Sequence, residues 1–136
     1  MMTVRAVTAE DMPEICQWSD ARGLHLVSSF LSPHGFLALD DGAPVLAVWA
    51  YMILDVPVIQ LDHLCGCPGL SIQAVREAWQ ALMRVIAEWV KIINSQSGLN
   101  YNVLRCFCEG RMLDEAVKSG WSASAPEYFQ IVKSLI

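Results

Sequence analysis

The sequence predicts a single α/β domain over residues 1–136, and three observations support this prediction. The length of 136 residues fits one domain with a substantial core. Short apolar runs rich in β-branched and aromatic residues alternate with segments of helical periodicity. The clearest helical segment begins after Ser71, and its apolar positions recur at three- and four-residue spacings. These positions are Ile72, Val75, Trp79, Leu82, Ile86, Trp89 and Ile93.

The N-terminal part is expected to form one strand and two helices. Residues 3–7 have the composition of a short strand. Thr8 begins the sequence T-A-E-D, which is typical of a capping box, so the first helix starts there. Arg22-Gly23 ends that helix, and residues 24–31 are predicted as a second short helix.

A β-hairpin is predicted next. Residues 36–39 and 45–54 flank Asp41-Gly42, a dipeptide that favours tight hairpin turns. The second run is apolar on both faces, which predicts a central strand. A further strand is expected over residues 58–64, followed by a Gly/Pro loop over residues 65–70.

The C-terminal part adds a strand at 101–108, a helix at 110–119 and a final strand at 128–135. The predicted element order is therefore β-α-α-β-β-β-α-β-α-β. The side chains expected on the inner face of the last helix are Met112, Leu113, Ala116 and Val117.

The composition excludes several classes of protein. The chain is 54% hydrophobic and 17% charged, which argues against intrinsic disorder. Its longest uncharged apolar stretch, residues 42–54, contains Pro44 and is shorter than the roughly 18 residues of a membrane span. Because so few charges are available for the surface, we expect a protein partner or a homo-oligomer.

The charge pattern also limits the partners and the cellular location. The net charge is −5, and no window gathers the Lys and Arg residues of a phosphate-binding surface, so nucleic-acid binding is not expected. The first residues lack the basic and apolar regions of a signal peptide, which predicts a cytoplasmic protein. The five cysteines are then expected to be free thiols.

Two stretches carry a resemblance to a known family. The opening V-R-A-V-T-A-E-D-M-P-E-I and the later L-D-E-A-V-K-S-G-W, in this element order, resemble the GNAT (Gcn5-related N-acetyltransferase) superfamily. The resemblance implies a mixed, mostly antiparallel sheet flanked by helices. It also implies transfer of an acyl group from acetyl-CoA, or another acyl-CoA, to an amine. The M-M-T-V-R start is similar to that of small phage or prophage proteins of this type.

In the resembled family, a Q/R-x-x-G-x-G/A loop after the central strand binds the pyrophosphate at the start of the long helix. Gly69 matches this pattern and Ser71 supplies a small polar residue. Gly66 replaces the Gln or Arg, Pro68 removes a backbone donor, and residues 43–72 contain no Lys or Arg, so we expect weakened binding. The implied cofactor-binding residues are Leu64, Cys65, Gly66, Gly69, Leu70 and Ser71.

The resemblance also implies catalytic positions. The general base would come from Asp62 or His63 on the central strand, which a regular strand points to opposite faces. Histidine titrates near neutrality, whereas a carboxylate needs burial to act as a base. The tyrosine that serves as the general acid in the family is replaced by Ala116. Tyr128, on the next predicted strand, would substitute for it only with an unusual geometry, and the alternative is a buried tyrosine with a hydrogen-bonded hydroxyl.

The cysteines allow three interpretations. His63, Cys65 and Cys67 end one predicted strand, and Cys106 and Cys108 end another. These side chains are core residues, metal ligands or a reactive thiol.

Three functional hypotheses therefore remain: an acyl-CoA-dependent N-acyltransferase, a catalytically inactive GNAT-like protein that acts through protein contact, and a cysteine-based metal or redox module. The second hypothesis includes a phage or prophage accessory or virion-associated protein. Titration with acetyl-CoA separates the first hypothesis from the others.

Overall fold

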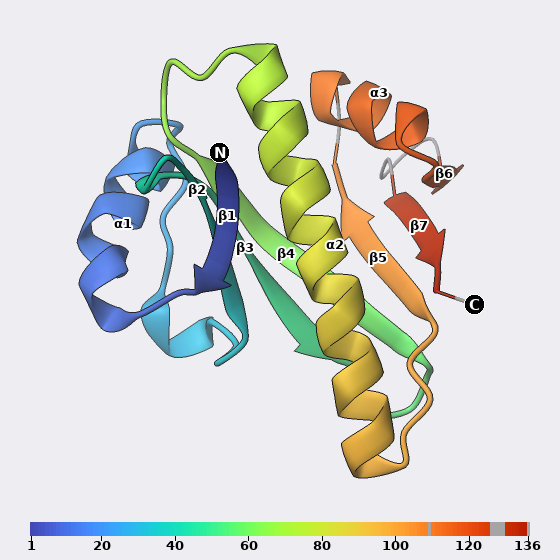
Figure 1. The fold of residues 1–136 in the computed structure, drawn as a ribbon. Coiled ribbons are helices and arrows are strands. Elements are labelled where there is room, and N and C mark those ends of the chain that lie inside the picture. The colour runs from blue at the N-terminus through green and yellow to red at the C-terminus, as the bar shows by residue number, and fades with distance from the viewer. Residues whose placement is uncertain (109, 126–129, 136) are drawn as a thin grey trace. The chain divides into compact units, whose positions relative to one another are not determined.

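The computed structural model describes residues 1–108, 110–125 and 130–135 (Figure 1). In these residues seven strands form one sheet with the order β1-β2-β3-β4-β5-β7-β6. The strands are β1 (Met2–Ala6), β2 (Gly35–Asp40), β3 (Ala43–Met52), β4 (Val58–Gly66), β5 (Val103–Phe107), β6 (Ser122–Ala125) and β7 (Gln130–Ser134). The helices are α1 (Met12–Asp20), α2 (Ile72–Ser97) and α3 (Gly110–Lys118), with short 3-10 turns η1 (Ala9–Asp11) and η2 (Ser28–Phe30).

The sheet is mixed and mostly antiparallel, as expected. Strand pairs β1/β2, β2/β3, β5/β7 and β6/β7 are antiparallel, whereas β4 and β5 are parallel. The chain forms two compact units, which we describe separately. Unit 1 comprises Met1–Trp49 and His63–Ile86, and unit 2 comprises Ala50–Asp62 and Ala87–Ile136.

The predicted hairpin is confirmed in unit 1. Asp41 and Gly42 join β2 to β3 with φ angles of 47° and 87°, the left-handed conformations that match the twist of a two-residue hairpin. Residues 45–49 of β3 are buried without interruption, which explains why both faces of this strand are apolar.

The first helix begins as predicted, but the second does not form. Thr8 and Asp11 make a reciprocal capping box ahead of α1. Residues 24–31 contain only the single turn η2, so the predicted helix over this range is wrong. Gly23 turns the chain with a φ of 74°, and two serines occupy the start of η2. Serine side chains favour caps and turns over helix interiors, which accounts for the difference.

Unit 2 contains the parallel pair of strands. Ile59 and Leu61 of β4 and Leu104 and Cys106 of β5 are buried, so alternate residues of both strands face the core. The second half of α2 ends at Ser97, and the next residue, Gly98, has the left-handed φ of 70° that is common after a helix.

Two details of the C-terminal part differ from the predictions. Strand β6 was not expected, since S-A-S-A lacks the residue types typical of strands. In α3 Ala116 is buried as predicted, but Val117 is 48% exposed and Glu115 is buried instead.

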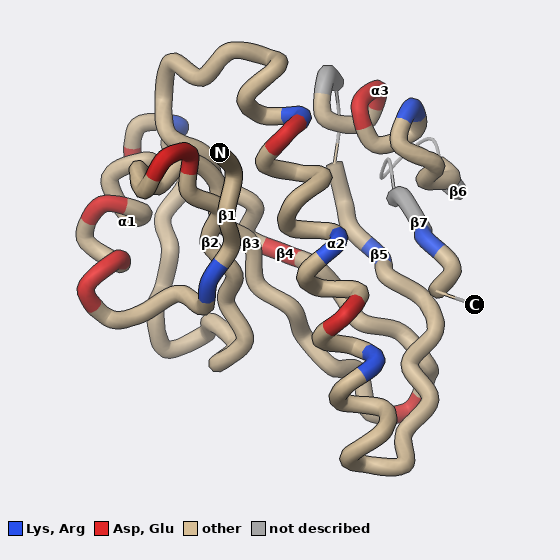
Figure 2. Tube along the Cα trace, in the orientation of Figure 1, with Lys and Arg blue, Asp and Glu red and all other residues tan. Residues whose placement is uncertain are grey.

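Charged residues are unevenly distributed along the chain. Figure 2 shows acidic residues on α1 and both charge signs along α2, while most of β2 and β3 is uncharged. No helix in the described ranges is long and apolar enough to cross a bilayer.

Candidate functional site

The backbone of β4 changes conformation at His63, the predicted general base. Its φ of 57° is left-handed, which is uncommon for a residue other than glycine. In the described residues the parallel pairing of β4 with β5 covers Val58 to Leu61, although β4 continues to Gly66. The regular alternation expected for Asp62 and His63 therefore does not hold across this point. Such local strain is frequently found at functional sites.

The side chain of His63 packs against Trp49. Their rings meet edge to face, with centroids 6.5 Å apart and an interplanar angle of 79°. Trp49 also lines a pocket of about 200 Å³ together with residues 7–9 and 31–33, and no ionisable side chain lines this pocket. The candidate base thus contacts a residue in the wall of an uncharged pocket within unit 1.

Trp49 is held closely against the neighbouring strand. A Cβ atom at Gly35 would lie 2.6 Å from Nε1 of Trp49 and 3.0 Å from Cβ of Val7. Only glycine therefore fits opposite this indole.

Strand β4 ends tightly packed against β3, which explains one departure from the family pattern. The backbone N–H of Cys67 donates to the carbonyl of Val45 at 2.8 Å. A Cβ at Gly66 would lie 3.2 Å from Cδ1 of Leu46 and 3.5 Å from the carbonyl oxygen of Val45. A side chain at this position would require Leu46 to shift by a few tenths of an ångström, so glycine relieves a close contact here.

The loop after β4 leads into the N-terminus of α2. Gly69 has a φ of 83° and open space around it. Ser71 caps the helix, because its Oγ accepts a hydrogen bond from the N–H of Ala74 at 3.1 Å. The N–H groups of Ile72 and Gln73 belong to the first turn, where a helix offers no carbonyl partners. Helix termini of this kind bind anions.

The predicted cofactor-binding residues therefore fall into two groups. Gly69, Leu70 and Ser71 lie at the start of α2. Leu64, Cys65 and Gly66 belong to β4, where Cys65 and Gly66 are buried.

The other positions that the family resemblance implied for catalysis are Asp62, Ala116 and Tyr128. Asp62 is exposed, so it lacks the burial that a carboxylate base needs. Ala116 is buried in α3, so no phenol stands at that position. Tyr128 lies outside the described residues.

Cys65 and Cys106 are buried, as core cysteines are, whereas Cys16, Cys67 and Cys108 are partly exposed. Burial raises the pKa of Cys65 to about 11 and that of Cys106 to about 12. It also raises the pKa of Cys108. Reactive cysteines have lowered values, so these thiols lack activation. Among the residues that the structure describes, no group of three or more His, Cys, Asp and Glu side chains could hold a metal ion.

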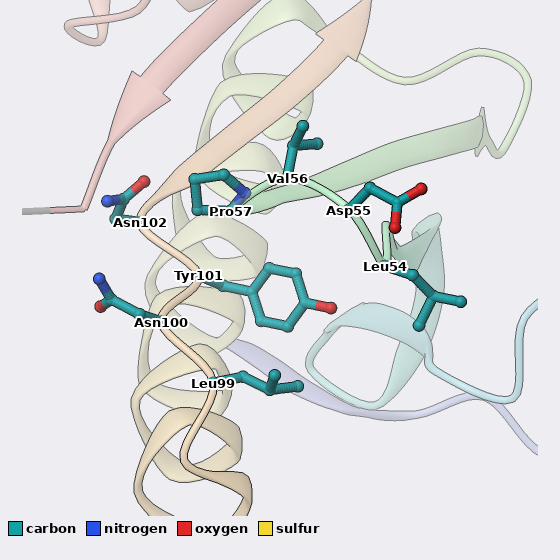
Figure 3. Close-up of a pocket in the computed structure, with 8 residues that line it drawn as sticks. All are labelled: Leu54, Asp55, Val56, Pro57, Leu99, Asn100, Tyr101 and Asn102. Carbon is teal, nitrogen blue, oxygen red and sulfur yellow. The ribbon is translucent and has the colours of Figure 1, made fainter.

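A second pocket, of about 260 Å³, lies in unit 2 between two loops that sequence analysis did not single out (Figure 3). Its walls are residues 54–57 and 99–102. The hydroxyl of Tyr101 donates to the carbonyl of Ile53 at 3.1 Å, and the Asn94 side chain binds both backbone polar groups of Tyr101. Leu54, on the rim, is 92% exposed. No pattern in these loops indicated a pocket, because their residues are separated in sequence.

Similarity to known proteins is found in structure and not in sequence. No protein-family model matches the chain, and no curated protein is similar to it in sequence. The structure is similar to Ard1 from Thermoplasma volcanium, with a TM-score of 0.74 and 11% identity over 99% of this chain and 98% of that chain.

Two further solved structures give the same result. The ribosomal-protein-S18-alanine N-acetyltransferase from Escherichia coli matches with a TM-score of 0.69 and 10% identity, over 97% of this chain and 91% of that chain. The N-acetylglutamate synthase from Neisseria gonorrhoeae, complexed with coenzyme A and N-acetyl-glutamate, matches with a TM-score of 0.67 and 13% identity. That match covers 100% of this chain but 35% of the synthase, so the chain spans about a third of its length. The chain thus has the fold of the GNAT acetyltransferases, as the resemblance of its sequence implied.

Proposed function

We propose that the chain is an acyl-CoA-dependent N-acyltransferase. The observation that carries this proposal is the departure of β4 from β5 after Leu61, with the left-handed His63 immediately beyond. The end of β4 that extends beyond its pairing with β5 leads directly to the capped N-terminus of α2. The fold supports the proposal, since the gonococcal synthase of this fold was solved with coenzyme A.

The loop before α2 and the first turn of α2 can supply some of the hydrogen-bond donors that the pyrophosphate of an acyl-CoA requires. The N–H groups of Ile72 and Gln73 and the hydroxyl of Ser71 would hold the pyrophosphate, and Gly69 leaves open space beside them. The N–H of Cys67 already binds Val45, so it is not available as a donor. These three donors alone predict modest affinity.

The bound cofactor would supply an activated thioester carbonyl as the acyl donor. His63 would accept the proton that the amine loses, because imidazole is a suitable base near neutral pH. Trp49 would hold the imidazole in place through its ring contact. Asp62 is exposed and is not assigned the role of base.

A pair of substitutions at Ser71 tests the proposal. Both Asp and Asn can cap a helix, so Ser71→Asp and Ser71→Asn should each preserve folding. The aspartate places a negative charge where the pyrophosphate would bind. We expect Ser71→Asn to bind acetyl-CoA nearly as well as the wild type, and Ser71→Asp to bind at least about 10-fold more weakly by isothermal titration calorimetry. Absence of wild-type binding at millimolar acetyl-CoA contradicts the proposal.

The alternative function, an inactive GNAT-fold protein that binds another protein, is favoured by one observation. Leu54, Val56 and Leu99 are exposed apolar side chains around the pocket in Figure 3. For this function we expect no acetyl-CoA binding, and a complex or homo-oligomer that dissociates when Leu54 is replaced by Glu. Light scattering coupled to size-exclusion chromatography measures the change in mass.

A further inference from the structure

Arg105 and Gln60 form a side-chain pair that the proposed acyl transfer does not use. They are register partners on the parallel strands β5 and β4. The Nε of Arg105 donates to Oε1 of Gln60 at 2.5 Å, and Nε2 of Gln60 donates to the carbonyl of Leu61 at 3.3 Å. Since arginine has only donors, the amide oxygen of Gln60 must face it. The guanidinium plane is therefore held in one orientation.

Within the described residues, the hydrogen bond of Nε to Gln60 is the one that the Arg105 side chain makes, and its terminal nitrogens have no partner there. Arg105 is half-buried, and no carboxylate in the described part of the chain forms an ion pair with it. Burying a cation without an anion is unfavourable. Arg5, by contrast, has its carboxylate in Asp11. An oriented guanidinium with open donors is suited to a ligand that supplies the anion.

The pair lies on the more accessible face of the sheet in unit 2. Leu104 and Cys106 are buried, whereas Phe107, which shares the face of Arg105 on β5, is 53% exposed. On β4 the next residue on the face of Gln60 is Asp62, about 7 Å farther along the strand. His63, the candidate base, follows Asp62 directly in the sequence.

We propose that Arg105, oriented by Gln60, binds a carboxylate of the acyl acceptor. The acceptor is then an amine that also carries a carboxylate, such as an amino acid or a short peptide with a free C-terminus. This inference rests on the proposed function and specifies its substrate class. The two terminal nitrogens of a guanidinium match the two oxygens of a carboxylate.

The charge balance favours a carboxylate over a phosphate. Arg105 is the only Lys or Arg within the sequence ranges of β3, β4 and β5. One cation neutralises a carboxylate, whereas a phosphate monoester carries nearly two negative charges at neutral pH. Asp62 on the same face of β4 further disfavours a doubly charged ligand.

The test compares matched acceptors and matched variants. Glycyl dipeptides with a free C-terminus are compared with the same dipeptides as C-terminal amides, so that only the carboxylate differs. Arg105→Gln removes the cation, and Arg84→Gln removes an exposed arginine on α2 as the control. Melting temperatures establish that each variant is folded.

We expect the wild type and Arg84→Gln to prefer the acids to the amides by about 10- to 100-fold in kcat/KM, the range for a hydrogen bond to a charged group. Arg105→Gln should reduce this ratio to near one, and Arg105→Lys should recover part of it. Gln60→Leu keeps the cation but frees its orientation, so it should lower the ratio less than Arg105→Gln.

A binding measurement separates this inference from the proposed transfer. Titration calorimetry of the acid and amide peptides requires no acyl transfer, and acetyl-CoA binding is measured independently. If binding of the peptide with a free C-terminus depends on Arg105 while acetyl-CoA does not bind, the carboxylate site is supported and the acyltransferase proposal is contradicted. Equal binding of acid and amide by the wild type, binding of neither, or an unchanged ratio in Arg105→Gln overturns the inference.

Discussion

The carboxylate of Asp11 accepts hydrogen bonds from both terminal nitrogens of Arg5, at 2.7 and 2.8 Å. The same carboxylate accepts the backbone N–H of Thr8 at 2.7 Å and closes the capping box before α1. One side chain thus joins the end of β1 to the start of the first helix. The hydrogen bonds from Arg5 and Thr8 hold the pKa of Asp11 well below its ordinary value.

This pairing predicts a pH-dependent contribution to stability. Because the folded-state pKa is lowered, the contribution is fully present above the unfolded value of about 3.9 and is lost as the pH falls below it. Asp11→Asn should lower the free energy of unfolding by about 1–2 kcal/mol at pH 7, the range for a helix cap. Urea unfolding at pH 7, 4 and 3 should show this difference shrinking. A difference that is constant over that range, or an equal loss in the exposed Asp55→Asn control, contradicts the prediction.

The left-handed conformation of His63 determines which substitution tests its chemistry. Asparagine tolerates a positive φ better than alanine, so His63→Asn should fold with little loss of stability, whereas His63→Ala adds backbone strain. If His63 accepts the amine proton, kcat of His63→Asn should fall by about 10²- to 10⁴-fold. Asp62→Asn should retain most of the activity. The reverse order of effects in a steady-state assay would assign the base to Asp62.

The buried thiols should be unreactive in the folded protein. Raising the pKa of Cys65 from 9.0 to about 11 lowers its thiolate fraction at pH 8 by about 100-fold. The pKa of about 12 for Cys106 lowers it further. Alkylation followed by mass spectrometry should find both unlabelled in the native protein and labelled in urea. Rapid native labelling of either thiol at pH 8 would favour the reactive-thiol hypothesis.

Replacing Gly35 should affect both stability and the candidate site. The added methyl group of Gly35→Ala would overlap the indole of Trp49, so we expect a loss of about 1–3 kcal/mol in unfolding free energy. Displacement of Trp49 should also lower kcat, since His63 packs against its ring. In a Trp49→Phe background the alanine should cost less, because the overlapping atoms are gone. Additive effects in this double-mutant cycle would show that the two positions are not coupled.

The parts of the fold that were predictable depend on local patterns. The Asp41-Gly42 turn specifies the hairpin by its backbone conformations, and the spacing of Trp79, Leu82 and Ile86 specifies the buried face of α2. Both signals lie within a few residues of sequence, so no knowledge of the tertiary structure is needed.

The parts that were missed depend on tertiary contacts. Strand β6 has no strand-forming residues of its own and gains its conformation by pairing with β7. Glu115 takes the buried position expected for Val117, because packing against other elements decides which face of a short helix is covered. The candidate site was likewise predictable only in part. The family resemblance identified the strand and loop that contain His63 and Ser71. The left-handed conformation of His63 and its contact with Trp49 have no signal in the local sequence.

The strand order also has a consequence for aggregation. Strands β1 and β6 are the outermost members of the described sheet, and outer strands can pair with strands of other molecules. Four-residue β6 offers a short template, while β1 carries Arg5 with its ion pair to Asp11. Charged groups and short length both discourage such intermolecular pairing. In a chain with so few charges, the ion pair of Arg5 and Asp11 therefore disfavours the pairing of β1, one edge strand of the sheet, with a strand of another molecule.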